Sequence, residues 1–370
     1  MNNLKAAHFL LIPELLYSPP NNALITAYIQ NGYSVDIYSP GVLPETTSYG
    51  ESVTTYRVEY SWLWILRHII NWRWFGYNLI SGTSEDPLAI IGVVNLIYQT
   101  ATISLVDEIK SGSYRGDRSE LWKKLCRLSI KRSSIRIVND ESRIDLLRNY
   151  ANLRDNSHII VYPGCFLNRP EKSRDRRIKH RNDWGLPEDA FIIGSSGGFN
   201  MTAGADWLLD TVRSNRDLCA VIQPLGVTPL SLYLLRNLQF NDRVFIQDKR
   251  MEWNEAWDSA QGFDVGVCVY TNQSPQFQKM GISSNRLCMF IAMGVPVIAS
   301  KQESFRFLET YGCGVLVEDI HDFKKGIDYI RDNCTRMKEN CEECFQNYIK
   351  PHSRYLTLKN SIHKLSGKVI

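Results

Sequence analysis

Residues 281–300 constrain the fold most, because they predict a helix that leads directly into a buried strand. The segment reads Gly-Ile-Ser-Ser-Asn-Arg-Leu-Cys-Met-Phe-Ile-Ala-Met-Gly-Val-Pro-Val-Ile-Ala-Ser. Its apolar side chains recur every three or four residues as far as Gly294, a residue type that commonly ends helices. The apolar run 295–299 then has the length and composition of a parallel strand. A helix joined to a strand in this way is the unit from which α/β domains are built.

The start of this helix is suited to an anion. Ser283 and Ser284 are of the type that caps helices, and a cap leaves the amides of Asn285 and Arg286 without partners inside the helix. Arg286 adds a positive charge beside them, so a diphosphate would fit there. An ordinary capped helix without a ligand has the same local sequence and stays an alternative.

The same alternation of apolar runs and helical patterns occurs in both halves of the chain. The first half has predicted strands at residues 6–12, 34–38, 88–93, 102–106, 135–138 and 159–162, and the second at residues 191–195, 219–223, 243–246, 264–269, 295–299 and 314–317. Strands that alternate with helices favour parallel sheets covered on both faces. The sequence therefore predicts two α/β domains, each with a doubly wound sheet.

A basic stretch separates the two series. Residues 168–182 carry seven Lys and Arg side chains and two acidic ones. We interpret this stretch as a linker between a domain of residues 1–167 and a second domain of residues 183–350. Pro351 precedes a last helical stretch, and residues 351–370 are expected to cross back onto the first domain.

Composition argues against several classes of protein. A net charge of +4 with 22% charged residues is unlike a dedicated nucleic-acid binder. Nine cysteines, an odd number set mostly in apolar or helical stretches, do not resemble a disulfide framework and indicate the cytoplasm. The first apolar run ends at Pro13 without a small-residue cleavage site, so a buried strand fits better than a signal peptide.

Several motifs follow one another in a recognisable order. They are Arg136-Ile-Val-Asn-Asp-Glu-Ser-Arg143, Val161-Tyr-Pro-Gly-Cys165, Trp184-Gly-Leu-Pro187, Asp264-Val-Gly-Val-Cys-Val-Tyr270 and Ser283-Ser-Asn-Arg-Leu-Cys-Met-Phe-Ile-Ala-Met-Gly-Val-Pro-Val297. In this order they resemble bacterial glycosyltransferases of the GT-B fold, in particular the large family-4-like (group 1) set, over most of the chain.

The resemblance implies two facing Rossmann-like domains with a cleft between them. It implies that the second domain binds a nucleotide-sugar donor, that the first presents the acceptor, and that transfer is metal-independent and retains the anomeric configuration. Two glutamates that many members carry are replaced here by Gly281 and Met289. The donor therefore stays open among UDP-, GDP-, dTDP- and CMP-sugars, and no tightly bound cofactor is expected.

The residues predicted to bind the donor follow strands of the second domain. Gly197 and Gly198 come directly after its first strand, where glycines let the backbone approach a ligand, although a plain turn is the alternative. The full set of candidates is Gly197, Gly198, Asn200, Thr202, Lys249, Arg250, Tyr270, Ser283, Ser284, Asn285 and Arg286.

Two carboxylates are the candidates for catalysis. Asp107 and Glu108 lie just past a predicted strand of the first domain, where either side chain could orient or deprotonate an acceptor hydroxyl. A solvated loop carboxylate or a helix cap is the alternative. Asp140 and Glu141 end another strand and are ambiguous in the same way, since a helix start favours acids regardless of catalysis.

Residues Trp62 to Ile80 predict a helix that contacts a membrane surface. Four tryptophans fall within residues 62–74, with Arg67 and His68 between them. Indoles with basic neighbours suit a lipid interface, and the polar residues argue against a spanning helix. An inter-domain core helix is the alternative.

The sequence therefore predicts a cytoplasmic enzyme at the inner face of the plasma membrane. We expect it to move a sugar from a nucleotide donor to a saccharide acceptor, lipid-linked, in cell-envelope polysaccharide assembly such as that of lipopolysaccharide or capsule. A sugar-nucleotide epimerase of the same fold is one alternative, and a catalytically silent scaffold protein is another. A zinc site formed by Cys334, Cys341, Cys344 and His352 is disfavoured by their spacing.

Overall fold

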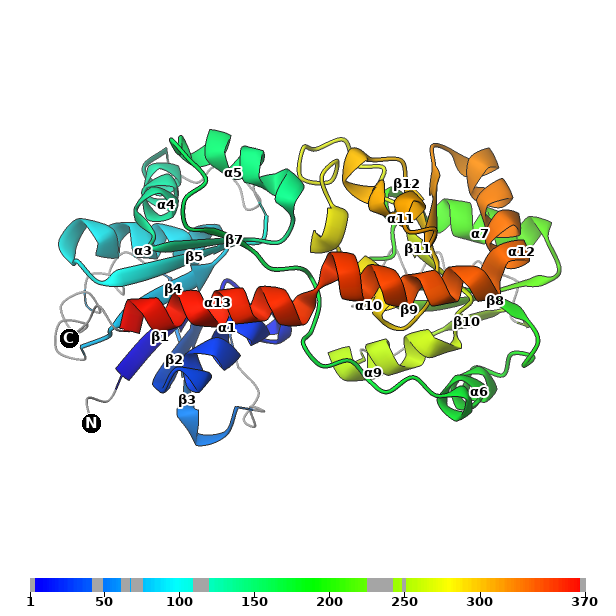
Figure 1. Ribbon diagram of the computed structural model, residues 1–370, viewed down its shortest axis with the longest axis horizontal. Coiled ribbons are helices and arrows are strands. Elements are labelled where there is room, and N and C mark those ends of the chain that lie inside the picture. The colour runs from blue at the N-terminus through cyan, green and yellow to red at the C-terminus, as the bar shows by residue number, and fades with distance from the viewer. Residues whose placement is uncertain are drawn as a thin grey trace. The chain divides into compact units, whose positions relative to one another are not determined.

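The chain folds into two compact units, each built around a parallel β-sheet. The computed structural model describes residues 4–41, 49–60, 67, 76–108, 120–224, 242–247 and 251–366. Unit 1 consists of Met1–Leu167 with Pro351–Ile370, and unit 2 of Asn168–Lys350. Figure 1 labels the helices and strands of both units.

The sheet of unit 1 has seven described strands, all parallel to their neighbours. They are β1 (Leu4–Phe9), β2 (Tyr33–Ser39), β3 (Val53–Arg57), β4 (Leu79–Thr83), β5 (Ala101–Val106), β6 (Ile135–Val138) and β7 (Ile159–Val161). Their order is β3-β2-β1-β4-β5-β6-β7. From β1 the chain adds β2 and β3 on one side and then β4 to β7 on the other, so the strand order reverses between β1 and β4.

Helices cover both faces of this sheet because successive side chains of each strand point to opposite faces. One core contains Ala6 of β1 together with side chains of α1 (Pro19–Gln30) and α13 (Pro351–Ser366). The other contains Ala7 of β1 with side chains of α3 (Glu85–Ile97), α4 (Glu120–Arg132) and α5 (Ile144–Ala151). The last helix of the chain therefore belongs to unit 1, where it lies beside α1 (Figure 1).

The sheet of unit 2 repeats this plan with six described strands. They are β8 (Phe191–Gly197), β9 (Leu218–Pro224), β10 (Val244–Ile246), β11 (Val265–Cys268), β12 (Val297–Ser300) and β13 (Gly314–Val317). Their order is β10-β9-β8-β11-β12-β13, and all described pairs are parallel. Here the chain reverses between β8 and β11.

The helices of unit 2 also pack on both sheet faces. They are α6 (Arg174–Asp183), α7 (Ala205–Ser214), α9 (Trp253–Ser259), α10 (Asn285–Ala292), α11 (Phe307–Thr310) and α12 (Ile320–Cys344). Side chains of α7 and α12 fill the core on one face. On the other face the rings of Phe263 and Phe290 lie directly over Gly194 and Gly266, where an added Cβ would come within 2.1 and 2.2 Å of them.

Short single-turn helices complete the described secondary structure. They are η1 (Pro13–Tyr17), η2 (Gly50–Ser52), η3 (Glu141–Arg143), η4 (Met201–Ala203), η5 (Ala260–Gly262), η6 (Gly281–Ser283), η7 (Glu303–Phe305) and the π-helical turn η8 (Phe345–Ile349). Two of them, η4 and η6, come just before α7 and α10 and shape the candidate site described below.

The α/β prediction is confirmed, but several segments differ from it. Strand β3, Val53–Arg57, was not predicted. Residues 88–93, expected to be a strand, lie within helix α3. A continuous apolar run cannot separate a buried strand from a buried helix, and α3 is covered by the sheet and by α4. Leu79 and Ile80, expected to end an interfacial helix, instead lie in the buried strand β4. The tryptophans of that segment are outside the described residues.

The basic stretch 168–182 is not a plain linker, because residues 174–182 lie in helix α6 of unit 2. Arg177 and Arg181 of α6 each approach a carboxylate oxygen of Asp264 to 2.5 Å, and Lys338 of α12 approaches it to 3.1 Å. Asp264 and Arg181 are almost fully buried. The basic run appeared solvated in the sequence because its acidic partner lies 83 residues beyond Arg181.

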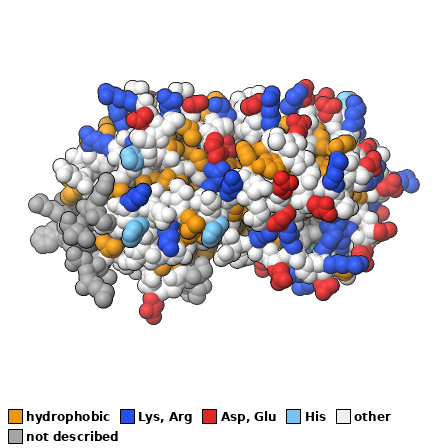
Figure 2. All heavy atoms as spheres, viewed as in Figure 1, with side chains coloured by type: hydrophobic (Ala, Val, Ile, Leu, Met, Phe, Trp, Pro, Cys, Tyr) orange, Lys and Arg blue, Asp and Glu red, His pale blue; other side chains and the backbone are white. Residues whose placement is uncertain are grey.

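The described surface mixes charges of both signs. On the face drawn in Figure 2, Lys and Arg side chains lie among Asp and Glu side chains rather than in a continuous basic stripe. Among the described helices, none combines the length and the hydropathy needed to cross a lipid bilayer.

Candidate functional site

The candidate donor site of unit 2 lies where the strand order reverses. In open parallel sheets, ligands bind outside the carboxyl ends of the strands at such a reversal. Gly197 ends β8, and Tyr270 lies two residues past the end of the neighbouring strand β11. The predicted donor-binding residues on these two strand ends are therefore brought to the same edge of the sheet.

Arg286 connects these strand ends. Its Nη2 atom donates a hydrogen bond to the carbonyl oxygen of Gly198 at 3.2 Å, and its guanidinium carbon lies 5.3 Å from the ring centroid of Tyr270. Its other terminal nitrogen, Nη1, is buried and has no hydrogen-bond acceptor among the described residues. A buried donor without an acceptor costs free energy. An acceptor such as a phosphate oxygen at this nitrogen would recover that cost.

The first turn of α10 adds backbone donors next to Arg286. Ser284 is the cap: its Oγ accepts a hydrogen bond from the amide of Leu287 at 3.3 Å and lies 2.6 Å from the hydroxyl of Tyr270. The amides of Asn285 and Arg286 belong to the first turn and have no partner inside the helix. Ser283 was expected to help cap α10, but it lies in η6 and its hydroxyl donates to the carbonyl of Met280 instead.

The loop after β8 has the backbone that a close-fitting anion needs. Gly197 has φ +92°, a left-handed conformation that side chains disfavour, and Gly198 is exposed beside it. Asn200 and Thr202 follow at the surface, with the Thr202 hydroxyl donating to Asn200 Oδ1 at 2.8 Å. The carbonyl of Thr202 accepts the amide of Thr271 at 3.0 Å, which ties this loop to the end of β11. Lys249 and Arg250 are outside the described residues.

Two side chains that the sequence analysis did not select support this site. The Nε2 of Gln302 donates to the carbonyl of Phe277 at 2.9 Å, and its Oε1 accepts from the amide of Met280 at 3.2 Å. Ser300 Oγ accepts from the amide of Tyr270 at 3.1 Å. Gln302 is buried just past β12, and a polar residue at a strand end is the only sequence signal that pointed to it.

In unit 1, Asp107 directly follows β5 at the carboxyl edge of its sheet. Its Oδ1 is buried without a hydrogen-bond partner among the described residues, and its backbone carbonyl accepts from Arg143. Burial raises the pKa of Asp107 to about 7, and the charge of Glu108 acts in the same direction. A hydrogen bond from Asn139 and the charge of Arg143 lower it in part. Asp107 therefore titrates near neutrality, as a general base should.

The other acidic candidates of unit 1 have structural partners. Asp140 caps η3, since its Oδ1 accepts from the amide of Ser142 at 2.8 Å and from its hydroxyl at 2.5 Å. Glu141 forms an ion pair of 2.7 Å with Arg354 of α13. Glu108 is exposed at the start of the next loop. Of these carboxylates, Asp107 has the environment most suited to proton transfer.

A buried polar network that the sequence analysis missed lies at the strand reversal of unit 1. The His8 ring is 2.8 Å from Ser81 Oγ through Nδ1 and 2.8 Å from Asn21 Oδ1 through Nε2, and Thr83 donates to the same Asn21 oxygen at 2.5 Å. Burial lowers the pKa of His8 to about 4, so the ring is neutral at physiological pH. Ser84, at the end of β4, has φ +73°, a strained backbone for a residue other than glycine.

Metal ligands are not grouped in the part of the chain that the structure describes. No set of three or more His, Cys, Asp or Glu side chains there has an arrangement that could hold a metal ion. Cys341 and Cys344 are buried in α12 of unit 2, whereas His352 is exposed on α13 of unit 1.

Comparison by sequence identifies no relative: no protein-family model matches, and no curated protein is significantly similar. Comparison by structure identifies proteins of similar fold. The sucrose-phosphate synthase of Thermosynechococcus elongatus aligns with a TM-score of 0.75 and 14% identity over 98% of this chain and 100% of that one. HepE of Anabaena, solved with UDP, aligns with a TM-score of 0.73 and 13% identity over 99% and 100% of the two chains.

The lipopolysaccharide glycosyltransferase WaaG aligns with a TM-score of 0.67 and 11% identity over 96% of this chain and 99% of that one. A UDP-N-acetylglucosamine 2-epimerase of Listeria monocytogenes, described as putative, aligns with a TM-score of 0.62 and 11% identity over 100% and 98%. These alignments span both units at low identity. The chain therefore has the GT-B fold, as the motif order predicted.

Proposed function

We propose that this chain is a glycosyltransferase that moves a sugar from a nucleotide-sugar donor to a saccharide acceptor. The observation that carries the proposal is Arg286, whose buried Nη1 has no acceptor among the described residues and lies beside the Gly197–Gly198 loop and the first turn of α10. A guanidinium, exposed glycine backbone and first-turn helix amides would together form a site for phosphate groups.

Donor binding by unit 2 would serve both affinity and chemistry. When the bond between the anomeric carbon and the phosphate oxygen breaks, negative charge develops on the departing nucleotide. The guanidinium of Arg286 and the amides of Asn285 and Arg286 would stabilise that charge with donors that need no rearrangement. HepE, of similar fold, was solved with UDP, which supports a nucleoside diphosphate as the leaving group.

The acceptor would be activated by Asp107 of unit 1. In the proposed step the acceptor oxygen bonds to the anomeric carbon, the nucleotide leaves with the bonding electron pair, and the hydroxyl proton passes to the Asp107 carboxylate. A carboxyl with a pKa of about 7 accepts a proton more readily than one with an ordinary pKa and is still substantially ionised near neutral pH.

For the acceptor we propose a lipid-linked saccharide of the cell envelope, handled at the inner face of the plasma membrane. The fold similarity to WaaG, a glycosyltransferase of lipopolysaccharide biosynthesis, supports this choice. The tryptophan-rich residues 62–74 would supply the membrane contact. If so, changing Trp72 and Trp74 to Ser should reduce sedimentation with anionic liposomes without unfolding the protein.

A sugar-nucleotide epimerase is the second candidate, because an epimerase is among the proteins of similar fold. Both activities need the phosphate site of unit 2, and they differ in whether an acceptor is needed. Incubation of each nucleotide sugar without acceptor separates them: an epimerase forms the isomeric nucleotide sugar, whereas a transferase releases the nucleotide only slowly, by hydrolysis. Binding without either reaction would favour a scaffold.

The experiment that tests the phosphate site is calorimetry after a thermal-shift screen of UDP, GDP, dTDP, ADP and CMP. Arg286→Ala should weaken binding of the stabilising nucleotide by about 1.5 to 3 kcal/mol, the range for a hydrogen bond to a charged group. Arg306→Ala is the matched control, because Arg306 is 71% exposed in the same unit and pairs only with nearby Glu303 in the described structure.

Unchanged affinity in a folded Arg286→Ala protein would remove the phosphate site from the proposal. Equal loss in Arg286→Ala and Arg306→Ala would show that the effect is only one of net charge. If no nucleotide in the screen binds the wild-type protein, the donor assignment itself is wrong.

A further inference from the structure

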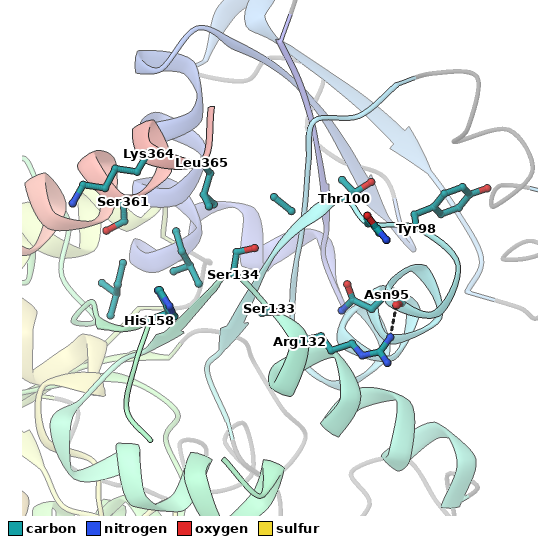
Figure 3. A pocket seen from close by; sticks show the side chains of 14 residues that line it. Asn95, Tyr98, Thr100, Arg132, Ser133, Ser134, His158, Ser361, Lys364 and Leu365 are labelled. Carbon is teal, nitrogen blue, oxygen red and sulfur yellow. Dashed lines mark hydrogen bonds between the residues drawn. The ribbon is translucent and has the colours of Figure 1, made fainter. Parts of the chain in front are cut away.

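A cavity of unit 1 lies at the edge of the sheet opposite to Asp107. It has a volume of about 1190 Å³ and is lined by the first residues of β5, β6 and β7, the last residues of α3 and α4, and the last turns of α13 (Figure 3). Asp107 follows the carboxyl end of β5, whereas the cavity includes Ala101 at its amino end. The cavity is therefore separate from the candidate catalytic carboxylate.

The charged side chains that line this cavity are all basic. They are Arg132 at the end of α4 and Lys364 near the end of α13, and the imidazole of His158 before β7 lies in the same lining. Arg132 uses one nitrogen to donate to the carbonyl of Asn95 at 2.6 Å, and no described acidic residue forms an ion pair with Arg132 or Lys364. Asp155, which is exposed, interacts electrostatically with His158 and with Arg136. The lining favours an anion.

Neutral polar side chains also line this cavity. The Nδ2 of Asn95 is buried and has no acceptor among the described residues, while its Oδ1 accepts from Thr102 at 3.3 Å. Ser134 and Ser361 add hydroxyl groups. Figure 3 shows Ser361, Lys364 and His158 on one side, Asn95 and Arg132 on the other, and Ser134 between them.

We propose that this cavity binds a phosphate-bearing sugar. His158 and Lys364 on one side would hold the phosphate, and Asn95 and Arg132 on the other side would pair with sugar hydroxyls. The Asn95 Nδ2, which has no acceptor among the described residues, can donate to a hydroxyl oxygen, and a Lys ammonium binds phosphate through charge-assisted hydrogen bonds. The same chemistry is offered by a free sugar phosphate and by the headgroup of a phosphorylated glycolipid, so the test includes both sources.

Protein NMR on the full chain tests the proposal through the resonances of His158. Glucose 6-phosphate should shift them saturably, and glucose should not. Lys364→Ala should weaken this binding about tenfold, the effect of losing one hydrogen bond to a charged group. Lys359→Ala removes the same charge from α13 at a position outside the cavity lining and should leave the affinity within about twofold.

Vesicles that contain phosphatidylinositol 4-phosphate, compared with vesicles of phosphatidylcholine alone, form the second arm. Binding to the phosphorylated headgroup that Lys364→Ala reduces, without binding of glucose 6-phosphate, assigns the cavity to a lipid headgroup. The proposal is overturned if neither phosphate source binds, if glucose binds as well as its phosphate, or if Lys359→Ala has the same effect as Lys364→Ala. Because Arg286 lies in unit 2, Arg286→Ala should leave this binding unchanged even if the proposed transferase function fails.

Discussion

The carboxyl edges of the two sheets have the same topology but opposite chemistry. In unit 2 the strand ends present a guanidinium nitrogen, Nη1 of Arg286, that has no acceptor among the described residues and lies beside Gly197 and Gly198. In unit 1 they present a carboxyl oxygen, Oδ1 of Asp107, that has no donor among the described residues.

We infer from this difference that function in such a fold depends on the one or two residues after each strand. The backbone has the same position twice, and under the proposed function the side chain there would decide whether that position binds a phosphate or accepts a proton. If the comparison is correct, changes at the two edges should affect different steps. Donor affinity should depend on unit 2, and transfer to an acceptor should depend on Asp107.

The largest expected effect is that of Asp107→Asn. Removing a general base should lower transfer about 10²- to 10⁴-fold while leaving nucleotide affinity unchanged, because the amide keeps the shape and cannot accept the proton. Transfer is measured as acceptor-dependent release of nucleotide, and affinity by calorimetry. Glu108→Gln is the matched control at the neighbouring exposed position.

Two results would break the comparison at this point. Full transfer activity in both Asp107→Asn and Glu108→Gln would remove this loop from the mechanism. A loss of nucleotide affinity in Asp107→Asn would mean that donor binding is not confined to unit 2, contrary to the proposal.

The next effect is expected at the glycines of the phosphate loop. Gly197→Ala places a side chain on a backbone with φ +92°, which should cost about 1 to 2 kcal/mol. This cost can lower the free energy of unfolding, the nucleotide affinity or both. Gly198→Ala is the control, because an added Cβ would lie 3.8 Å from Arg286 and from Asn200, an ordinary contact. Calorimetry and thermal unfolding of both variants give the comparison. Equal tolerance of both would show that the loop relaxes freely and does not hold a fixed phosphate site.

The third effect concerns pH. Because the pKa of Asp107 is raised to about 7, transfer at pH 6 should be about tenfold below its plateau, and nucleotide binding should not follow the same curve. Stability should change in the opposite sense: a carboxyl with a raised pKa destabilises the fold as pH increases from about 4 to about 7. Asp107→Asn should therefore raise the melting temperature at pH 8 and change it little at pH 4. A flat pH profile of transfer would contradict the assignment of the base.

The sequence predicted the positions of the residues at the carboxyl edge of unit 2 better than the surroundings of those in unit 1. In unit 2 these residues are close in sequence to the elements that position them: Ser284 caps α10, Arg286 lies in its first turn, and Gly197 ends β8. Local pattern is enough to place them in the fold, and their binding of phosphate stays a prediction. The pairing of Arg286 with the Gly198 carbonyl is long-range and was not predicted.

The features that were missed depend on distant partners. His8 meets Ser81 across two strands, and Asp264 joins the basic helix α6. In the sequence, His8 is only an isolated polar residue in a predicted strand. The basic run of α6 has no acidic partner close to it in the sequence. Asp107 and Asp140 looked equivalent for the same reason, since each is an acid after a strand. Hydrogen bonding distinguishes them: Asp140 Oδ1 accepts from Ser142, and Asp107 Oδ1 has no donor among the described residues.

The smallest expected effect sharpens that distinction. Asp140→Ala removes the acceptor for the amide and the hydroxyl of Ser142 and should lower the free energy of unfolding by about 1 kcal/mol, the usual cost of a lost helix cap. Transfer and nucleotide affinity should stay within about twofold of wild type, because a capping carboxylate takes no proton from the acceptor. Asp140→Asn keeps an oxygen acceptor and should recover most of the stability. Denaturant unfolding of both variants measures stability, and transfer assays measure activity. If the role of Asp140 is structural, only stability changes; if it is catalytic, transfer changes as well. If Asp140→Asn keeps its stability but loses transfer about a hundredfold, the general base is Asp140, and the buried carboxyl of Asp107 has a different task.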